Sequence, residues 1–396
     1  MIAIVTDVHY RMSLALIRDC SQAGAEVITC EWEGHRDNPA SPALGSLSRY
    51  VSRHVWLPED QGVEPILELC REVLAERGER SALLPTGAAT LAAVAADRQR
   101  FDAVCGLAVP TPEQLDLFNS KERLAALAAS LDVPVPKSFS MEAGESVAAF
   151  VRRLPLPCVI KPVCGEKLGL TAAQRYAIVR SPEEAEAHYH RFASLSGQAP
   201  VVQAYLSGAG LGCDLLADHG EIVAAICHQR VREYPVSGGP SSCCRCVDRP
   251  DLREYAARLV AETGYTGLAM FEFKEDGEGH PHLLEVNPRI WGTFPLTRVT
   301  GSGIPLLWAI LAHNAGNGGA PIPLPEIPVP RQKKMIFAAS DLMAGLGYAR
   351  RGRPGQLFAA LGDFLNPAVR DGLFEWGDML PGLAYYRSLI TKEKRG

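Results

Sequence analysis

Short apolar runs alternate with segments of helical periodicity along the first hundred residues of the chain. Strands separated by helices of this length predict a parallel sheet with both faces covered. The turn after the first strand contains no glycine, so the G-x-G-x-x-G fingerprint of a dinucleotide site is absent there. His9, in this turn, is expected to be a local turn or substrate-edge residue rather than a catalyst. The predicted strands cover residues 2–6, 25–30, 81–86 and 101–107, and the predicted helices cover residues 13–23, 63–77 and 87–100.

The clearest alternation of apolar and polar positions lies in residues 267–292, GLAMFEFKEDGEGHPHLLEVNPRIWG. This pattern predicts two strands joined by the polar turn EDGEGH, because successive side chains of a strand point to opposite faces. If the hairpin closes around Glu278 and Gly279, Glu272 on the first strand lies opposite Glu285 on the second. The hairpin therefore brings two carboxylates together.

Facing carboxylates repel each other, so a cation must lie between Glu272 and Glu285. Asn287 leaves the same face of the strand as Glu285, and all three side chains are hard oxygen ligands of the kind that Mg²⁺ takes. Arg289, two residues further on, adds a planar donor for carboxylate or phosphate oxygens. The alternative is a surface hairpin with a charged outer face, and the apolar character of both arms argues against it.

Lys161 ends a short apolar strand, ahead of a loop that contains Gly165 and Gly169. A buried ammonium group is costly unless an anion meets it, and a phosphate is a natural partner. The alternative is a lysine that emerges into water at the end of the strand. Lys161 alone does not decide between the two.

Length and composition set broad limits. A chain of 396 residues has room for two or three domains, and 47% hydrophobic with 21% charged residues is typical of a folded globular protein. The net charge of -5 argues against a nucleic-acid-binding protein. No apolar run approaches the about 20 residues of a membrane span, and the first ten residues lack the basic segment of a signal peptide. We therefore expect a cytoplasmic protein.

The chain contains 11 cysteines, an odd number scattered along its length, which is typical of free thiols in a reducing compartment. Cys243, Cys244 and Cys246 form a cluster that raises the question of a zinc site. No second cysteine or histidine pair stands at a matching spacing, so ordinary thiols are the favoured interpretation.

Five motifs, taken together and in order, resemble those of the ATP-grasp superfamily. The resemblance covers Lys121 to about Leu307 and is greatest to the predicted carboxylate–amine ligases (ATP-dependent carboligases), with biotin carboxylase and carbamoyl-phosphate synthetase more distant. The region before it is similar to the pre-ATP-grasp domain of that superfamily. The motifs are NSKERL, CVIKPVCGEKLGL, VVQAYLSG, MFEFK and LLEVNPRIWG.

The resemblance implies ligands for ATP and its metal. Lys121 and Lys161 match the two lysines that hold the nucleotide phosphates. Gly165 to Gly169 matches the glycine-rich loop over the β- and γ-phosphates, where small residues let backbone N–H groups approach. Ala209 stands where many relatives have a ribose-binding glutamate. The adenine hinge is matched by Gln203, Tyr205 and Leu206, and the ligands of Mg²⁺, with Mn²⁺ as the alternative ion, by Glu272, Glu285 and Asn287.

The resemblance also implies basic residues around the reacting groups. Arg289 matches the arginine that steadies the acyl phosphate or the tetrahedral intermediate. Arg230 and Arg232 fall where relatives place basic residues near the γ-phosphate and the acceptor. Thr293 takes the approximate position of the bicarbonate-activating glutamate of biotin carboxylase, which counts against a carboxylase. Cys164 lies in the phosphate loop, but no base for a covalent role is identifiable.

These parts imply an ATP-dependent ligase that joins a carboxylate to an amine through an acyl phosphate and releases ADP and phosphate. Basic side chains and cations are needed because both the substrate and the transferred phosphoryl group are negative. The alternatives are an ATP-grasp kinase that phosphorylates a small molecule and a non-catalytic ATP-binding scaffold. The expected partners are a small-molecule carboxylate and amine, with no nucleic acid, no transmembrane segment, and a homodimer left open.

After Leu307 the pattern weakens into a stiff, proline-rich connector at residues 320–330. Beyond it lie basic runs and an apolar set that includes Phe358, Leu361, Phe364 and Leu365. One interpretation is an amphipathic segment that binds a membrane surface or a partner. The favoured one is a helical cap packed on the ATP-grasp domain with its basic face in water, because glycines and prolines break any long helix.

The predicted fold class is α/β. An N-terminal pre-ATP-grasp Rossmann-like domain (residues 1–112) is followed by a two-lobed α+β ATP-grasp domain (113–318, with lobes at about 113–200 and 201–318). The proline-rich connector and a small C-terminal extension form residues 319–396.

Overall fold

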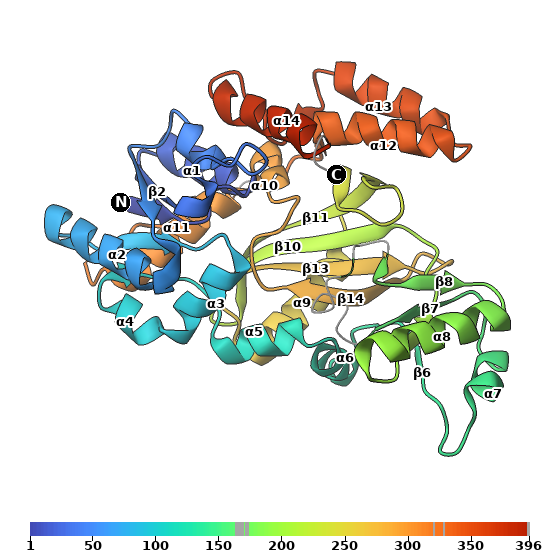
Figure 1. Ribbon diagram of the computed structural model, residues 1–396. Coiled ribbons are helices and arrows are strands. Elements are labelled where there is room, and N and C mark those ends of the chain that lie inside the picture. The colour runs from blue at the N-terminus through green and yellow to red at the C-terminus, as the bar shows by residue number, and fades with distance from the viewer. Residues whose placement is uncertain (163–169, 171–173, 320, 328, 394–396) are drawn as a thin grey trace.

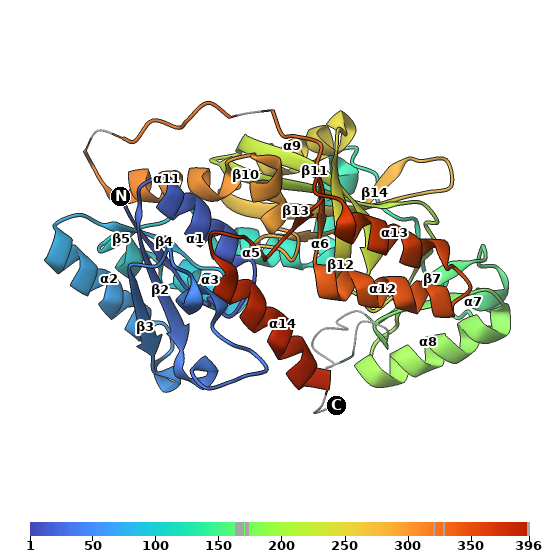
Figure 2. The same ribbon diagram turned by 90° about the horizontal axis from the view of Figure 1, so that it is seen from above.

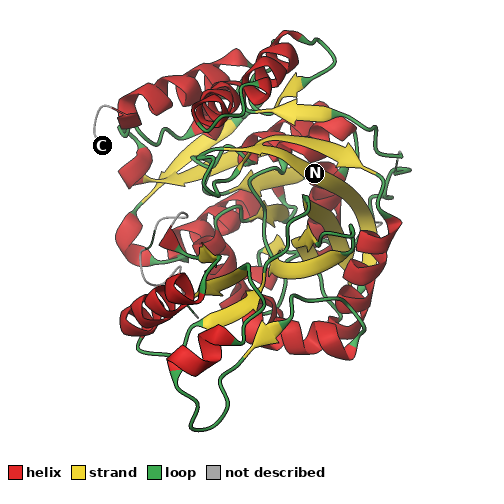
Figure 3. Ribbon diagram, turned by 90° about the vertical axis from the view of Figure 1, so that its right-hand side faces the viewer, coloured by secondary structure: helices red, strands yellow, loops and turns green. Residues whose placement is uncertain are grey.

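The computed structural model describes residues 1–162, 170, 174–319, 321–327 and 329–393. Their strands form three sheets of five, seven and four strands. Figure 3 shows these strands in yellow with helices packed around them. The chain is therefore of mixed α/β architecture, as predicted.

The N-terminal sheet has the strand order β3-β2-β1-β4-β5, and all of its pairings are parallel. The parallel sheet predicted from the alternation of strands and helices is confirmed, although its edge strand β3 was not predicted. That strand reads RHVWL and is only half-buried, so it lacks an apolar run. The strands are β1 (Ile2–Val5), β2 (Glu26–Trp32), β3 (Arg53–Leu57), β4 (Ser81–Leu84) and β5 (Cys105–Gly106), and the helices are α1 (Ser13–Gln22), α2 (Glu64–Arg77), α3 (Ala88–Ala96), α4 (Arg98–Asp102) and α5 (Pro112–Asn119).

Strands β1 and β4 are neighbours, and the chain continues from β1 toward one edge of the sheet and from β4 toward the other. Such a switch point commonly binds ligands at the carboxyl ends of its strands. Here Asp7 fills this position with the chain's own carboxylate. Its carboxylate accepts hydrogen bonds from the backbone N–H of Gly87 (3.2 Å) and the hydroxyl of Thr90 (2.8 Å), at the start of α3. A Cβ on Gly87 would lie 2.6 Å from the Asp7 carboxylate. The start of α3 is thus neutralised internally.

The other two sheets lie on either side of the predicted nucleotide site. The four-stranded sheet has the order β6-β9-β7-β8, and the seven-stranded sheet has the order β14-β13-β10-β11-β12-β15-β16. The former comprises β6 (Ser138–Phe139), β7 (Cys158–Lys161), β8 (Ala177–Val179) and β9 (Val201–Ala204), with α6 (Lys121–Ser130), α7 (Val147–Arg152) and α8 (Pro182–Ser196) nearby. The seven-stranded sheet contains β10 (Gly210–Asp218), β11 (Glu221–Glu233), β12 (Ser241–Val247), β13 (Gly267–Glu275) and β14 (Pro281–Asn287), together with β15 and β16. Helix α9 (Pro250–Thr263) lies between β12 and β13 in the chain, and α10 (Pro295–Thr300) and α11 (Ile304–Gly316) follow β14.

Helix α11 returns from the seven-stranded sheet to the N-terminal sheet, where it lies beside β4 and β5 (Figure 2). The Trp308 indole donates to the carbonyl of Ala108 at 2.7 Å. Gly106 is required at this contact, because a Cβ there would lie 1.9 Å from the carbonyl oxygen of Ala312. Helix α11, which follows the β13–β14 hairpin, therefore packs against both the N-terminal sheet and the seven-stranded sheet.

The C-terminal segment also spans the molecule. Strand β15 joins the edge of the seven-stranded sheet against β12, and α12 packs over β11 and β12. At the far end, Asp378 accepts from Arg18 (2.9 Å) and Ser48 (2.8 Å) of the N-terminal domain, so α14 lies across both halves (Figure 2). The elements are β15 (Lys334–Ile336), α12 (Ala338–Arg350), α13 (Gly355–Leu365), β16 (Arg370–Asp371) and α14 (Met379–Glu393). Among the described residues, no helix is both long and apolar enough to cross a membrane.

Candidate active site

The β13–β14 hairpin forms and Glu272 pairs with Glu285 as predicted, although the register shifts between Glu272 and Phe273. On the other face of β13, Phe271 and Phe273 are fully buried in the core beneath α9. This burial fixes which face of the hairpin is apolar, so Glu272, Glu285 and Asn287 must share the opposite face.

Each carboxylate of this pair has its own basic partner. Arg230 Nη1 lies 2.9 Å from Glu272 Oε1, and Lys121 Nζ lies 3.5 Å from Glu285 Oε2. Burial raises the pKa of Glu272, Arg230 opposes the shift, and the charge of Glu285 adds to it. The two basic partners come from different elements, Arg230 from β11 and Lys121 from α6.

Lys161 is half-buried at the end of β7, in the four-stranded sheet. Burial, together with the like charge of Lys121, lowers the pKa of Lys161 to about 8, and Glu285 opposes the shift. These mutual effects show that both lysines and a hairpin carboxylate lie within electrostatic reach of one another. The structure thereby brings together residues 40 to 164 positions apart. The loop residues Gly165 and Gly169, like Cys164, lie outside the described residues.

The predicted adenine hinge joins the four-stranded sheet to the seven-stranded one. Gln203 lies on β9 and donates from Nε2 to the Ser138 hydroxyl at 3.2 Å. Tyr205 and Leu206 follow the strand, and Leu206 is buried. Ala209 presents only its backbone, whose N–H donates to Glu275 Oε2 at 3.3 Å. The hinge residues therefore lie at the junction of the two lobes, and their contact with adenine stays a prediction.

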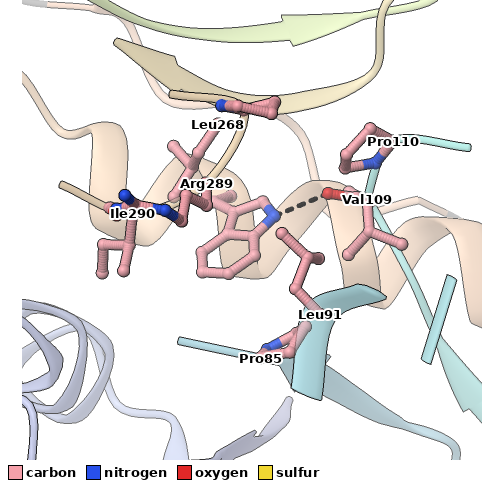
Figure 4. A pocket seen from close by; sticks show the side chains of 10 residues that line it. Pro85, Leu91, Val109, Pro110, Leu268, Arg289 and Ile290 are labelled. Atoms are coloured by element: carbon pink, nitrogen blue, oxygen red, sulfur yellow. Dashed lines mark hydrogen bonds between the residues drawn. The ribbon is translucent and has the colours of Figure 1, made fainter. Parts of the chain in front are cut away.

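Arg289 follows the metal-ligand strand and is held by local bonds. Its Nη2 donates to Asn287 Oδ1 at 2.9 Å and its Nη1 to the carbonyl of Ile290 at 3.0 Å. Arg289 also lines a cavity of about 10 Å³ between the hairpin and the N-terminal domain (Figure 4), which has room for a single water at most. Burial and Asp7 raise the pKa of Tyr10, and Arg289 opposes the shift, so the β1 turn lies near this arginine.

The structure does not bring Arg232 to the site with Arg230. Arg232 is 1% exposed and donates from Nε and Nη2 to both oxygens of Asp341 on α12, at 2.8 and 2.6 Å. It also pairs with Asp363 on α13. The register between β11 and β12 shifts between Arg230 and Arg232, and this irregularity turns the second arginine to the opposite face. Its contacts are those of a structural residue beneath the C-terminal helices.

The cysteine cluster lies on β12, and Cys243 sits close to Asp341 and Asp363. Both carboxylates are already bound by Arg232, and burial raises the pKa of Cys243 to about 12. A protonated thiol beside neutralised carboxylates is a poor zinc site. All ten cysteines in the described part of the chain are buried and free, which favours the interpretation as ordinary thiols.

A buried Asp214–His228 pair beside Glu272 was missed from the sequence. His228 Nδ1 lies 2.8 Å from Asp214 Oδ2, and the two side chains are 3% and 0% exposed. Gly212 lies between His228 and Glu272 on the intervening strand, and a Cβ there would be 2.3 Å from His228 Cε1. The signal was present, since His228 precedes Arg230 by two positions, but pairing with Asp214 requires knowledge of the β10–β11 register. The aspartate orients the ring, and His228 opposes the effect of burial that raises the pKa of Glu272.

The hairpin residues fit a hard divalent cation. Glu272, Glu285 and Asn287 offer only oxygen donors from one face of adjacent strands, next to lysines suited to phosphates. Mg²⁺ takes such carboxylates together with substrate phosphate oxygens. The arrangement as a whole can hold an anionic nucleotide between two lobes.

Comparisons with known proteins agree with this geometry. Residues 197–333 match the family model described as "ATP-grasp in the biosynthetic pathway with Ter operon". This match over residues 197–333 supports the assignment of the chain to the ATP-grasp superfamily.

Two of the similar proteins are large chains of carbamoyl phosphate synthase. The carbamoyl phosphate synthase large chain of Rubrobacter xylanophilus is 25% identical over 298 residues, covering 71% of this chain and 26% of that protein. The arginine-specific large chain of Geobacillus stearothermophilus is 24% identical over 208 residues, covering 50% and 18% respectively. This chain thus spans only about a fifth to a quarter of their length.

Solved structures share the fold. Biotin carboxylase from Campylobacter jejuni, in a β,γ-ATP complex, matches with a TM-score of 0.60 at 15% identity, over 84% of this chain and 73% of that one. The biotin carboxylase domain of Hydrogenobacter thermophilus 2-oxoglutarate carboxylase, solved with MgADP and bicarbonate, matches with a TM-score of 0.58 at 14% identity over the same shares. At this identity the likeness concerns the fold.

Proposed function

We propose that this chain is an ATP-dependent ligase that joins a carboxylate to an amine through an acyl phosphate, with release of ADP and phosphate. The observation that carries the proposal is the meeting of Glu272 and Glu285 with Lys121 and Lys161 between two lobes. Superfamily membership and the carbamoyl phosphate synthase relatives support an ATP-dependent carboxylate ligase.

In this proposal the chain's own residues divide the work. Lys121, Lys161 and the loop from Gly165 to Gly169 hold the phosphates of ATP, and Gln203, Tyr205 and Leu206 hold adenine. Glu272, Glu285 and Asn287 would hold Mg²⁺, or Mn²⁺. The bound cation would neutralise phosphate charge and so favour attack by an anion.

Two bond changes complete the reaction. A carboxylate oxygen attacks the γ-phosphorus, and the bond from that phosphorus to the ADP oxygen breaks. The amine nitrogen then attacks the carbonyl carbon, loses a proton and expels phosphate. Arg289 and Arg230 are placed to stabilise the negative charge that develops on these oxygens. Arg232 is left out of this mechanism because Asp341 and Asp363 already neutralise it.

A carboxylase is disfavoured by Thr293. The resemblance puts Thr293 at the approximate position of the bicarbonate-activating glutamate of biotin carboxylase. Thr293 is 6% exposed, and its hydroxyl has no hydrogen-bond partner among the described residues. A hydroxyl group cannot serve as a general base at neutral pH. The free, buried thiols support a reducing compartment, and we place the reaction in the cytoplasm.

The test is a screen of the full chain with ATP and Mg²⁺ against a matrix of small acids and amines, with ADP release as the readout. Acids that raise the melting temperature in the presence of ADP and Mg²⁺ are screened first. A ligase releases ADP over repeated turnovers only when acid and amine are both present, because the acid alone can form at most the enzyme-bound acyl phosphate. ADP formed with one substrate, which becomes a stable phosphorylated product, would establish a kinase instead, and ATP binding with no ADP formation in any pair would establish a scaffold.

A further inference from the structure

Helix α13 exposes a continuous apolar face to solvent. Phe358 is 71% exposed, Leu361 42%, Phe364 52% and Leu365 77%. Their spacing of three, four and seven positions places them on one side of the helix. The packed cap expected from the sequence therefore uses the other side of this helix, and the apolar set lies outward.

The inner side of α13 is firmly anchored. Ala360 is fully buried, and a Cβ on Gly345 of α12 would lie 3.1 Å from the Ala360 Cβ, so the two helices are in close contact. Asp363 pairs with Arg232 and with Lys334. The outward direction of the apolar side chains is thus set by packing and by buried ion pairs.

A second group of exposed apolar side chains lies on and just before α14. Trp376 is 83% exposed, Leu380 64% and Leu383 53%. Figure 1 shows α12, α13 and α14 in red and orange along one edge of the molecule. We call the exposed side chains of this layer the C-terminal face; it comprises Phe358, Leu361, Phe364, Leu365, Trp376, Leu380 and Leu383.

The charges of this layer are sorted by sign. The acidic side chains between residues 331 and 389 all have internal partners. Asp341 and Asp363 bind Arg232, and Asp371 accepts hydrogen bonds from two backbone N–H groups at 2.8 and 2.7 Å. Glu375 pairs with Arg298 of α10, and Asp378 pairs with Arg18 of α1.

Several basic side chains of the same layer lie in solvent, whereas Lys334 pairs with Asp363. Arg350, Arg351, Arg353 and Arg370 are all exposed, in a chain whose net charge is -5. Arg351 donates to the carbonyl of Val236 at 3.1 Å, which leaves its charge without an acidic partner among the described residues. The outer surface of the layer is therefore apolar and positive.

We propose that the C-terminal face binds the surface of an anionic lipid membrane. Exposed phenylalanine, leucine and tryptophan beside arginine are the side chains of an interfacial helix, which lies in the headgroup region without spanning the bilayer. A second copy of the chain is a poorer occupant, because a symmetric contact would set the arginines of each copy against a face with no free acidic group.

The test is co-sedimentation of the full chain with vesicles of phosphatidylcholine alone, or of phosphatidylcholine with about one third anionic phosphatidylglycerol. We expect binding to the anionic vesicles that weakens with added salt. The double variant Phe358→Ser/Leu365→Ser should bind about tenfold or more weakly, since both side chains are lost from the interface. Arg350→Gln/Arg353→Gln should reduce binding to anionic vesicles, again by about tenfold.

Matched controls on α8 carry the same chemistry away from this face. Leu195→Ser (45% exposed) and Arg191→Gln should leave vesicle binding unchanged. No binding to anionic vesicles, or equal loss in the α8 variants, would overturn the proposal. A concentration-dependent dimer in sedimentation velocity that is lost in Phe358→Ser/Leu365→Ser, with no vesicle binding, would assign the face to a second copy and likewise overturn it.

Discussion

Lys121 Nζ lies 3.5 Å from Glu285 Oε2, so a proposed phosphate ligand is paired with a proposed metal ligand. Lys121 competes with the metal ion for Glu285, and Glu285 competes with the phosphate for Lys121. A phosphate that binds Lys121 frees Glu285, and a cation that binds Glu285 frees Lys121. Nucleotide and metal should therefore bind cooperatively, and the coupling must be equal in both directions.

Glu285→Gln should lower turnover by at least about 100-fold while leaving the fold intact, because one oxygen ligand loses its charge. Without Mg²⁺ its melting temperature should stay level or rise, since the charge of Glu285 contributes to the raised pKa of Glu272. Glu272→Gln should lose turnover equally. Glu278→Gln, at an exposed position in the turn of the hairpin, is the matched control and should resemble the wild type. Wild-type turnover in the Glu272 or Glu285 variant would remove that residue from the metal site.

Lys161→Ala should weaken ATP binding by about tenfold or more, because a charge-assisted contact with phosphate is lost. Arg289→Ala should change ATP affinity by less than about threefold and abolish product formation, because the proposed mechanism assigns its guanidinium to the acyl group and not to ATP. Calorimetric titration of ATP into both variants measures the difference. An equal loss of ATP affinity in the two would refute this division of roles.

The affinity for ATP should depend on pH through Lys161. The pKa of Lys161 is lowered to about 8, so its positive charge is present below that pH and is lost as the pH rises through it. ATP affinity should accordingly fall between about pH 7 and pH 9. Lys161→Arg keeps its charge over this range and should remove the dependence. A fall of the same size in the arginine variant would assign the titration to another group.

Substitution of Arg232 should lower stability, whereas substitution of Arg230 should lower activity. Arg232→Ala leaves Asp341 and Asp363 without their buried partner and should lower the free energy of unfolding by about 3–5 kcal/mol. Arg230→Ala should cost far less stability, because Arg230 is part-exposed, and should reduce turnover. Urea unfolding and ADP release are measured on both variants. A stable but inactive Arg232→Ala would return this residue to the catalytic machinery.

The hairpin could be predicted because its information is local. Alternation of period two decides which side chains share a face, and the polar turn brings the two arms together, so the meeting of Glu272 with Glu285 follows from the sequence. The register shift between Glu272 and Phe273 does not follow from it. The parallel N-terminal sheet could be predicted for a similar reason. Its strands and helices alternate at lengths that only a parallel sheet accommodates.

The failures arise where distant segments meet. The resemblance to relatives implied that Arg232 lies near the reacting groups with Arg230, but the irregularity in β11 directs Arg232 toward Asp341 and Asp363 instead. Asp214 and His228 pair only because β10 and β11 are neighbours in this register. Strands β15 and β16 have three and two residues, too few for any pattern. They form because β15 pairs with the edge of β12 and β16 then pairs with β15.

The central claim is an acyl phosphate formed by attack of a carboxylate on the γ-phosphorus of ATP. Once the acid is identified, both its carboxylate oxygens are labelled with ¹⁸O and the phosphate released with the amide product is analysed by mass spectrometry. The account predicts ADP and a phosphate that carries one ¹⁸O, because the amine expels the bridging oxygen with the phosphoryl group. AMP as the product, or ADP with unlabelled phosphate, would contradict it.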